Sequence, residues 1–438
     1  MISIFVSHGA GRLARGLTIG AALVVAGACY DAGKILDQDA PSRVTATDLD
    51  NPNYAQLLVT SAIGDFECAF TQYIVATGLV GDELIDTQLS QAGWDYDRRT
   101  MFPASGPYSL GGCTSTQVPA LYTPLAVARF DADKILKNLQ GWTDAQVANR
   151  QSLIAQAAVY AGYSLELLGE SMCSAAIDLG PEMTRQQIFA AAEARFTTAI
   201  TAATGTNPTM LKAAYVGRAR ARLNQNNLTG AGADAALLTD TAFVLNATYS
   251  ATATRRENLV WSQMYRGLFS AIDPSFRGLT FGGAPDPRVN VVDAMVVGSD
   301  RTTEIWRQTK YTTIGSPIPI ARYAEAQLIL AEADNAANNT TAAVDIINAL
   351  HAKAGIPAYA GGTKAEVQAQ IIEERRRELF LESQRFGDLI RYNIAIQPAP
   401  GTAFPVKGGS YGPNTGLQLC FPLPDVERNN NPNIGKSS

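Results

Sequence analysis

The chain has 438 residues, and its 35 basic and 40 acidic side chains give a net charge of −5 at neutral pH. This balance lacks the basic excess that nucleic-acid binding requires, so we expect no nucleic-acid partner. The only histidines are His8 and His351, which argues against a catalytic triad and against His-based zinc catalysis. His351 stands in a helical pattern and is predicted to be a structural surface residue.

Residues 1–28 have the pattern of an export signal. Arg12 and Arg15 precede an apolar run at 17–26 that is too short to span a bilayer. The run ends in Val-Ala-Gly-Ala-Cys at 25–29, the pattern of a bacterial lipoprotein cleavage site. We therefore predict a lipoprotein signal peptide over 1–28 and membrane attachment through a lipidated Cys29. The alternative is an ordinary secretory signal. The polar residues 29–50 are predicted to be a tether.

Cysteine usage agrees with export. In an oxidising compartment the remaining four cysteines can pair in three ways, and the sequence does not choose among them. No two of them form a C-x-x-C motif, so we expect no zinc site. These cysteines are Cys68, Cys113, Cys173 and Cys420.

Without the signal the chain has about 410 residues, more than a single hydrophobic core usually includes, so we expect two lobes. The two regions are predicted at 51–240 and 241–438. Apolar spacing predicts a long helix over 51–80, and glycines and prolines predict a loop over 90–120. Alanine-rich helices are predicted at 122–139, 146–172, 185–204, 208–224 and 229–239.

The composition changes after residue 240. Aromatic residues interspersed with Gly, Pro and Asp predict long loops and short strands as far as residue 320. Helices are expected again at 320–337 and 341–354, followed by a long charged helix at 364–383. The sequence thus predicts a mainly α-helical protein.

The densest charge pattern lies at 373–392, where five arginines and five acids alternate with apolar residues. Glu373 and Arg377 are four residues apart and can pair on a helix. A solvated helix face is the plainest interpretation of such a run. From Glu373 onward the residues follow the order E-x-R-R-R-E-L-x-x-E-x-x-R-x-x-D-L-I-R-Y. This order nevertheless resembles a segment of the SusD/RagB family of nutrient-uptake outer-membrane lipoproteins.

Four further segments resemble this family in the right order. Asp286-Pro287-Arg288 resembles its D-P-R turn, and residues 322–333 resemble its R-Y-A-E-x-x-L-x-x-A-E-A helix. Residues 346–357 resemble its I-N-x-[VI]-R-x-R-A-G segment, with His351 and Lys353 at the usual arginine positions. Phe-Pro-Leu-Pro at 421–424 and Asn-Pro-Asn at 431–433 resemble its closing motifs.

The resemblance implies a fold of four tetratricopeptide-like helix pairs plus a loop-rich face with short strands. In the family's terms, 51–240 would be the SusD-like N-terminal helical region and 241–438 the C-terminal region. It also implies a lipid-anchored protein of the outer membrane, on the cell surface, that captures oligosaccharides. The captured ligand would pass to a SusC-like TonB-dependent transporter, and no catalytic residue is expected.

On this view the charged segment is scaffold that ties the C-terminal region to the helix pairs through ion pairs. We expect this structural role for Arg375, Arg376, Glu378, Arg385, Asp388 and Arg391.

Ligand-binding candidates are aromatic residues in the expected loops, because sugar rings bind to aromatic faces with polar groups beside them. Trp94 is preferred, since its neighbours are polar and its segment is not helical in pattern. Each tryptophan could instead pack in the core. The full candidate set is Trp94, Tyr96, Asp97, Arg98, Trp261, Tyr265 and Trp306.

Three other functions remain open. A peptide could replace the oligosaccharide, as in RagB-like members of the family. An exported glycoside hydrolase would need only two carboxylates, which the chain has in excess. A tetratricopeptide-like scaffold could bind an envelope protein. No cofactor is expected; loop acids leave a structural calcium ion open, although no EF-hand-like spacing supports one.

Overall fold

A computed structural model of the chain describes residues 50–104 and 106–435. Contacts divide the chain into Met1–Asn51 and Pro52–Ser438, and all elements below belong to the second unit. The expected signal peptide at 1–28, the lipidated Cys29 and the tether up to residue 49 lie outside the described residues.

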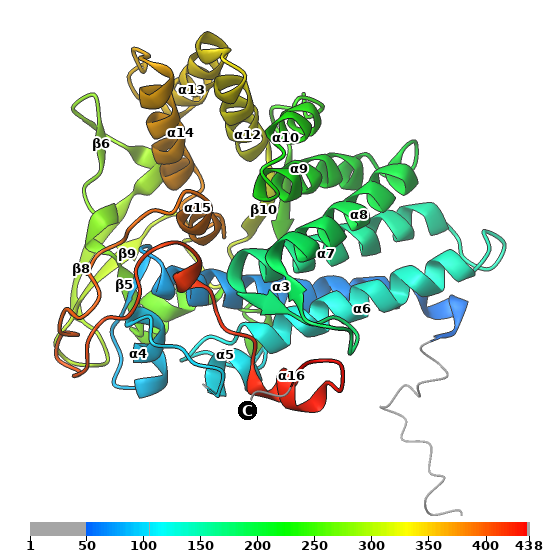
Figure 1. Cartoon of the computed structure of the whole chain (residues 1–438), viewed down its shortest axis with the longest axis horizontal. Helices are drawn as coiled ribbons and strands as arrows, with labels where there is room; N and C mark the ends of the chain where they lie inside the picture. Colours follow the sequence, from blue (N-terminus) through cyan, green and yellow to red (C-terminus); the bar gives the residue numbers. More distant parts are fainter. Residues whose placement is uncertain (1–49, 105, 436–438) are drawn as a thin grey trace, which may run out of the picture. The chain divides into compact units, whose positions relative to one another are not determined.

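Long helices make up most of the first half of this unit (Figure 1). The helix predicted at 51–80 begins at Ala55, and all five alanine-rich helices predicted between 122 and 239 form. In chain order the helices are a 3-10 turn (Pro52–Tyr54), α3 (Ala55–Val80), α4 (Gln91–Asp97), α5 (Gly106–Leu110), α6 (Tyr122–Gly141), α7 (Arg150–Ser171), α8 (Arg185–Ala203), α9 (Pro208–Asn224) and α10 (Leu228–Ala235).

Short strands form five separate antiparallel pairs among the described residues, which confirms the expectation of short strands among loops. The pairs are β1 (Leu84–Asp86) with β5 (Ser270–Ile272), β2 (Ser174–Ala175) with β3 (Met183–Thr184), β4 (Val244–Ala247) with β10 (Ile318–Arg322), β6 (Thr280–Phe281) with β7 (Ala284–Pro285), and β8 (Val291–Val297) with β9 (Glu304–Gln308).

Helices return in the C-terminal half, where they alternate with single turns. The α-helices are α11 (Leu259–Ser262), α12 (Tyr323–Ala336), α13 (Thr340–Ala354), α14 (Lys364–Glu378), α15 (Arg385–Arg391) and α16 (Asp425–Asn430). A π-helical turn (Gln263–Gly267) continues α11, and 3-10 turns lie at Thr254–Arg256, Pro274–Phe276, Pro287–Val289 and Gly416–Leu419.

The long helices pack as pairs: α3 with α6, α7 with α8, α9 with α10, and α12 with α13. The mainly α fold with four helix pairs is therefore confirmed. One hydrophobic cluster contains buried residues from Ala55 through to Ile434. The helical half and the loop-rich half thus share a core.

Two glycines allow α7, α8 and α9 to approach closely. The ring of Phe196 on α8 lies against Gly162 on α7 and Gly217 on α9. A Cβ atom at Gly162 would come within 2.7 Å of this ring, and one at Gly217 within 2.3 Å. Since real Cβ contacts are longer, both positions need glycine in this packing.

The sequence predicted a charged helix at 364–383, and the predicted end of this helix is wrong. α14 stops at Glu378, and a turn separates it from α15. Within the turn Leu381 has a φ of +56° and Ser383 a φ of +77°, so the helix cannot continue. Side chains from other segments form hydrogen bonds with the backbone of this turn. The Leu381 N–H donates to Glu83 Oε1 at 2.7 Å, and the Tyr311 hydroxyl donates to the Leu381 carbonyl at 3.0 Å.

His351 is buried, so its prediction as a surface residue is wrong. Its Nε2 lies 2.8 Å from Glu374 Oε1, and its Nδ1 lies 2.7 Å from the Pro357 carbonyl oxygen. The ring also contacts Phe281 edge to face. His351 therefore joins α13 to α14, a role that its local helical pattern did not reveal.

Two disulfides select one of the three pairings left open by the sequence. Cys68 on α3 pairs with Cys113, and Cys173 pairs with Cys420. The second bond ties the end of α7 to the C-terminal segment. There, backbone hydrogen bonds of 2.8 Å run from the Cys173 N–H to the Phe421 carbonyl and from the Phe421 N–H to the Ser171 carbonyl.

Candidate functional site

The charged segment is engaged in internal ion pairs. Arg375 donates from Nε to Asp388 Oδ2 at 2.8 Å, which joins α14 to α15. Arg385 donates two hydrogen bonds, of 2.8 and 2.6 Å, to the carboxylate of Asp82 just after α3. All four side chains are buried, so the pairs connect helices through the interior.

The rest of the segment also contacts protein groups. Arg391 donates to both oxygens of Glu332 on α12, at 2.5 and 3.1 Å. Glu378 accepts a 2.8 Å hydrogen bond from Arg322, the residue that precedes α12. Arg376 lies over a phenylalanine ring at 4.2 Å. The contacts of Arg391 and Glu378 tie α15 and α14 to α12 and the residue before it.

Trp94 lies on α4, so the prediction that residues 90–120 are all loop is wrong. Its indole Nε1 donates to the Gln88 carbonyl at 2.8 Å, and its ring is half-buried. Tyr96 is fully buried, and its hydroxyl donates to the Pro119 carbonyl at 2.5 Å. Tyr96 is therefore a core residue rather than a ligand contact.

Asp97 and Arg98 also serve the local structure. Asp97 is buried and accepts the Asp86 N–H at 2.7 Å; burial raises the pKa of Asp97 to about 7. Arg98 donates to Asp95 Oδ1 at 2.5 Å and to the Gly408 carbonyl at 3.2 Å. The second contact holds a loop of the C-terminal half against α4.

Trp261 and Tyr265 form a parallel aromatic stack. Their ring centroids are 5.3 Å apart and their planes differ by 2°. The stack follows from local backbone structure, because Trp261 lies on α11 and Tyr265 on the π-helical turn that continues it. Both rings are half-buried, so part of each remains at the surface.

Arg307 on β9 extends this stack. Its guanidinium lies 4.8 Å from the Tyr265 ring centroid, and its Nε donates to the Met264 carbonyl at 3.0 Å. Tyr265 in turn donates its hydroxyl to the Gln308 carbonyl at 2.7 Å. Two loop-separated segments thus fix a row of three flat groups, which we call the aromatic platform (Trp261, Tyr265 and Arg307).

Trp306 is next to Arg307 on β9 but belongs to a different contact group. The guanidinium of Arg277 lies 5.0 Å from its ring centroid, and successive strand residues point to opposite faces. Trp306 is therefore not part of the aromatic platform, although the sequence suggested it as a ligand-binding candidate alongside Trp261 and Tyr265.

One loop connects the Trp94 region with the aromatic platform. The Gln117 carbonyl accepts a 3.3 Å hydrogen bond from Gln88 Nε2 and a 3.0 Å hydrogen bond from Gln263 Nε2. The Gln88 carbonyl holds the Trp94 indole, and Gln263 starts the turn that carries Tyr265. Both glutamines are fully buried. No sequence signal pointed to them, because their partners are backbone carbonyls far along the chain.

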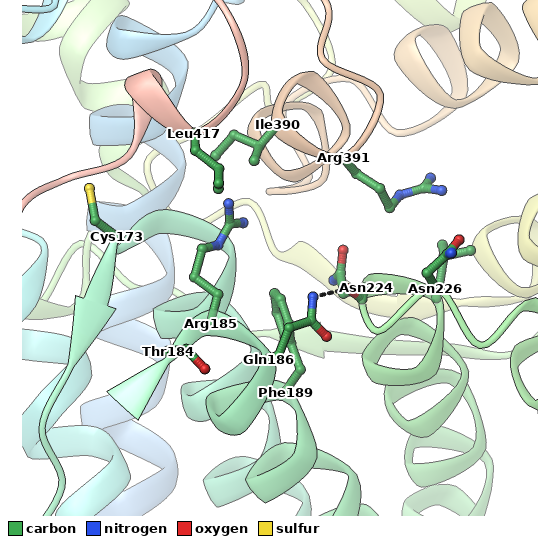
Figure 2. A pocket seen from close by; sticks show the side chains of 11 residues that line it. Cys173, Thr184, Arg185, Gln186, Phe189, Asn224, Asn226, Ile390, Arg391 and Leu417 are labelled. Atoms are coloured by element: carbon green, nitrogen blue, oxygen red, sulfur yellow. Dashed lines mark hydrogen bonds between the residues drawn. The ribbon is translucent and has the colours of Figure 1, made fainter. Parts of the chain in front are cut away.

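A separate cavity of about 640 Å³ is lined by residues of α8, α9, α15 and the Gly416–Leu419 turn, with Cys173 just after α7 (Figure 2). Of the candidate and scaffold residues from the sequence, it contains only Arg391. Its walls combine apolar side chains with amides and two arginines, Arg185 and Arg391. The sequence did not indicate this cavity, because most of the residues that line it lie in segments whose pattern is that of ordinary packed helices.

No cluster of three or more His, Cys, Asp or Glu side chains that could hold a metal ion occurs among residues 50–104 and 106–435. In the same part of the chain, every helix is too short or too polar to cross a membrane.

Solved structures share this fold. A SusD superfamily protein from Bacteroides vulgatus superposes with a TM-score of 0.69 at 15% identity, over 88% of this chain and 100% of that one. A SusD-like carbohydrate binding protein from the same organism gives 0.66 at 16% identity, over 88% and 98% of the two chains. A laminarin binding SusD-like protein gives 0.65 at 16% identity, over 88% and 99%. The architecture is thus that of the SusD superfamily.

Sequence comparison leads from the fold to the family. Residues 295–436 match the model of the SusD family. A SusD-like protein P38 from Formosa agariphila is 34% identical over 89 residues, and this match spans only 18% of either chain. The match to the SusD family model confirms the resemblance that the sequence motifs indicated, over residues 295–436.

Proposed function

We propose that this protein binds oligosaccharides on its aromatic platform. The observation that carries the proposal is the parallel stack of Trp261 and Tyr265, extended by Arg307. Sugar rings have apolar C–H faces that pack on aromatic rings, while their hydroxyls need hydrogen-bond partners at the rim. The two Nη groups of Arg307 make no hydrogen bond to the described residues and can supply such partners.

Similar proteins support the choice of ligand. Two of the solved structures with this fold are described as carbohydrate binding and laminarin binding. The three side chains of the aromatic platform include no carboxylate, whereas glycoside hydrolysis needs a pair of them. We therefore favour capture without turnover over glycoside hydrolysis.

The cellular role follows from the export pattern. A lipidated Cys29 would hold the protein at the outer membrane, on the cell surface. There the captured oligosaccharide would be delivered to a SusC-like TonB-dependent transporter. Two measurements test this role: loss of radiolabelled fatty acid in Cys29→Ser, and co-purification of a TonB-dependent transporter from detergent-solubilised outer membranes.

Binding is tested by calorimetry on the protein without residues 1–28. We expect laminari-oligosaccharides or another neutral glucan series to bind, and Trp261→Ala and Tyr265→Ala to weaken binding by about ten- to a hundredfold. Trp142→Ala is the matched control, because Trp142 caps α6 in the helical half and should leave affinity unchanged.

Other outcomes would redirect the assignment. Shortened oligosaccharides after incubation would establish a hydrolase. Binding of oligopeptides but of no glycan would favour a RagB-like peptide carrier. Affinity for an envelope protein alone would favour the tetratricopeptide-like scaffold. Trp94→Ala tests the site preferred from sequence: an equal loss of glycan affinity in a folded protein would extend the site to α4.

A further inference from the structure

We infer that the cavity lined by α8, α9, α15 and the Gly416–Leu419 turn is a second binding site, for a sugar that carries a carboxylate, such as a hexuronate. The inference does not rest on the proposed function, because the cavity shares no residue with the aromatic platform. Its volume of about 640 Å³ falls within the range of small-molecule sites.

Arg185 supplies the anion-binding group. Its Nε donates to the Gly169 carbonyl at 2.6 Å and its Nη2 to the Glu170 carbonyl at 3.2 Å, so the end of α7 fixes the guanidinium. Nη1 makes no hydrogen bond to residues 50–104 and 106–435, and no ion pair of Arg185 with a carboxylate occurs there. Figure 2 shows the guanidinium directed toward Ile390 and Leu417 across the cavity.

The second arginine of the cavity does not compete for this role. Arg391 is engaged by Glu332 and Asp388, and in Figure 2 its side chain points away from Arg185. A fixed guanidinium with an available N–H is a good partner for a carboxylate, because charge-assisted hydrogen bonds are short and strong.

Two buried acids lie near Arg185, and both form hydrogen bonds with a residue other than Arg185. Asn224 donates to Glu166 Oε1 at 2.6 Å and to Glu170 Oε1 at 3.1 Å, while Glu166 Oε2 is buried without a hydrogen-bond partner among the described residues. Burial raises the pKa of Glu166 well above its ordinary value, which favours the uncharged form of this group. The charge of Glu170 is offset by Arg220, which is fully buried.

The remaining walls suit a sugar ring. The side chain of Asn226 at the rim is exposed, and Gln186 donates to the Asn224 carbonyl at 3.2 Å while its own Oε1 stays available. Amides both donate and accept, as hydroxyl groups require. Apolar side chains, including Ile390 and Leu417, complete the cavity and can contact a C–H face.

The experiment compares D-glucuronate and D-galacturonate with neutral D-glucose by calorimetry or ligand-observed NMR on the protein without residues 1–28. We expect a uronate to bind at least about tenfold more tightly than glucose, with an affinity that falls as salt rises. Arg185→Gln should abolish this preference. Since Arg185 also caps α7, a second variant is needed that leaves the scaffold intact.

Leu417→Asp is that variant. Leu417 is 64% exposed and lines the cavity, so an aspartate there should fold normally and weaken uronate binding about tenfold more than glucose binding, because only the uronate is repelled by the added charge. Leu237→Asp is the matched control, because Leu237 is 52% exposed and lies outside the cavity.

Three results would overturn the inference: no uronate binding at 50-fold excess over about 1 mM protein, equal affinity for uronate and glucose, or uronate affinity unchanged in both Arg185→Gln and Leu417→Asp. Preferential binding of a short peptide that Leu417→Asp blocks would overturn the sugar assignment. Trp261→Ala should not affect uronate binding at this cavity, so a failure here is distinguishable from a failure of the aromatic platform.

Discussion

Arg375 Nε lies 2.8 Å from Asp388 Oδ2, and the two side chains are only 2% and 5% exposed. Burial by itself would raise the pKa of Asp388, but Arg375 and Arg391 hold that pKa below its ordinary value. The carboxylate therefore stays charged in the interior at neutral pH. A buried charge of this kind is tolerated only while its partners remain in place.

Arg375→Ala is expected to lower the free energy of unfolding by about 3–5 kcal/mol, because it leaves Asp388 less compensated in the interior. Denaturant unfolding followed by circular dichroism measures the loss. Lys212→Ala is the control: its pair with Asp240 is 35% and 38% exposed, so the loss should be about 1 kcal/mol or less. Equal losses in both variants would contradict the clamp role of the buried pair.

Arg376 tests whether the charged segment touches ligand. Its guanidinium donates to the Ser275 carbonyl at 2.5 Å and to Glu373 at 3.0 Å. Arg376→Ala should therefore lower stability by about 1–2 kcal/mol and leave oligosaccharide affinity unchanged. Calorimetry on the folded variant decides: loss of binding without loss of fold would show that the segment is more than scaffold.

Glu83 should make stability depend on pH. It is fully buried, and burial raises its pKa from 4.5 to about 7 in spite of the hydrogen bond from the Leu381 N–H. The folded protein then binds a proton that the unfolded chain releases. This group's contribution to stability is present below about pH 4.5 and falls by about 3 kcal/mol as pH rises to about 7.

Glu83→Gln isolates this effect, because the glutamine oxygen can still accept the Leu381 N–H. The difference in unfolding free energy between variant and wild type, measured from pH 4 to pH 8, should grow in favour of the variant as pH rises. A difference that does not change with pH would show that Glu83 titrates at its ordinary value.

The disulfides close loops of very different length, 45 residues for Cys68–Cys113 and 247 for Cys173–Cys420. On the chain-entropy account, replacing either pair by serines should cost about 2–5 kcal/mol, with the larger loss for the longer loop. Non-reducing peptide mapping checks the pairing, and unfolding of the double variants checks the loss. Peptides linked as Cys68–Cys173 would disprove the pairing itself.

Gly217 should not tolerate a methyl group. A Cβ atom there would meet the Phe196 ring at 2.3 Å, so Gly217→Ala should cost about 1–3 kcal/mol in spite of alanine's better helix propensity. Gly141→Ala is the matched control at the end of α6, where nothing lies within 4 Å and stability should change by about 0.5 kcal/mol or less. Thermal unfolding compares the two.

The helical half was predictable because its signal is local. Apolar spacing and caps such as Thr184 with Gln187 define where α8 begins, and Asn207 caps α9. By contrast α4 contains Gly93, two aspartates and a tryptophan, so its propensity for helix is poor. Burial of Tyr96 against distant segments stabilises it, and that information is not local.

The aromatic platform illustrates the same limit. The sequence suggested Trp261 and Tyr265 together as a group of loop aromatics, but it did not predict how their rings lie. Their parallel stack depends on a π-helical turn, which is rare and has no simple sequence signal. Arg307 completes the row from a strand 42 residues after Tyr265 in the chain. The cavity at Arg185 could not be foreseen, because its walls combine α8, α9 and α15 with the Gly416–Leu419 turn, which lie far apart in the sequence.

Phe421 has a consequence for how the protein matures. Its backbone bonds to Ser171 and Cys173, and its ring contacts those of Tyr96, Tyr108 and Phe386 at centroid distances of 5.6–6.1 Å. A chain that leaves the ribosome or a secretion channel from its N-terminus has none of these contacts until Phe421 has emerged. The interior that Phe421 fills between α4, α5 and α15 therefore cannot be completed while only the helical half has been released.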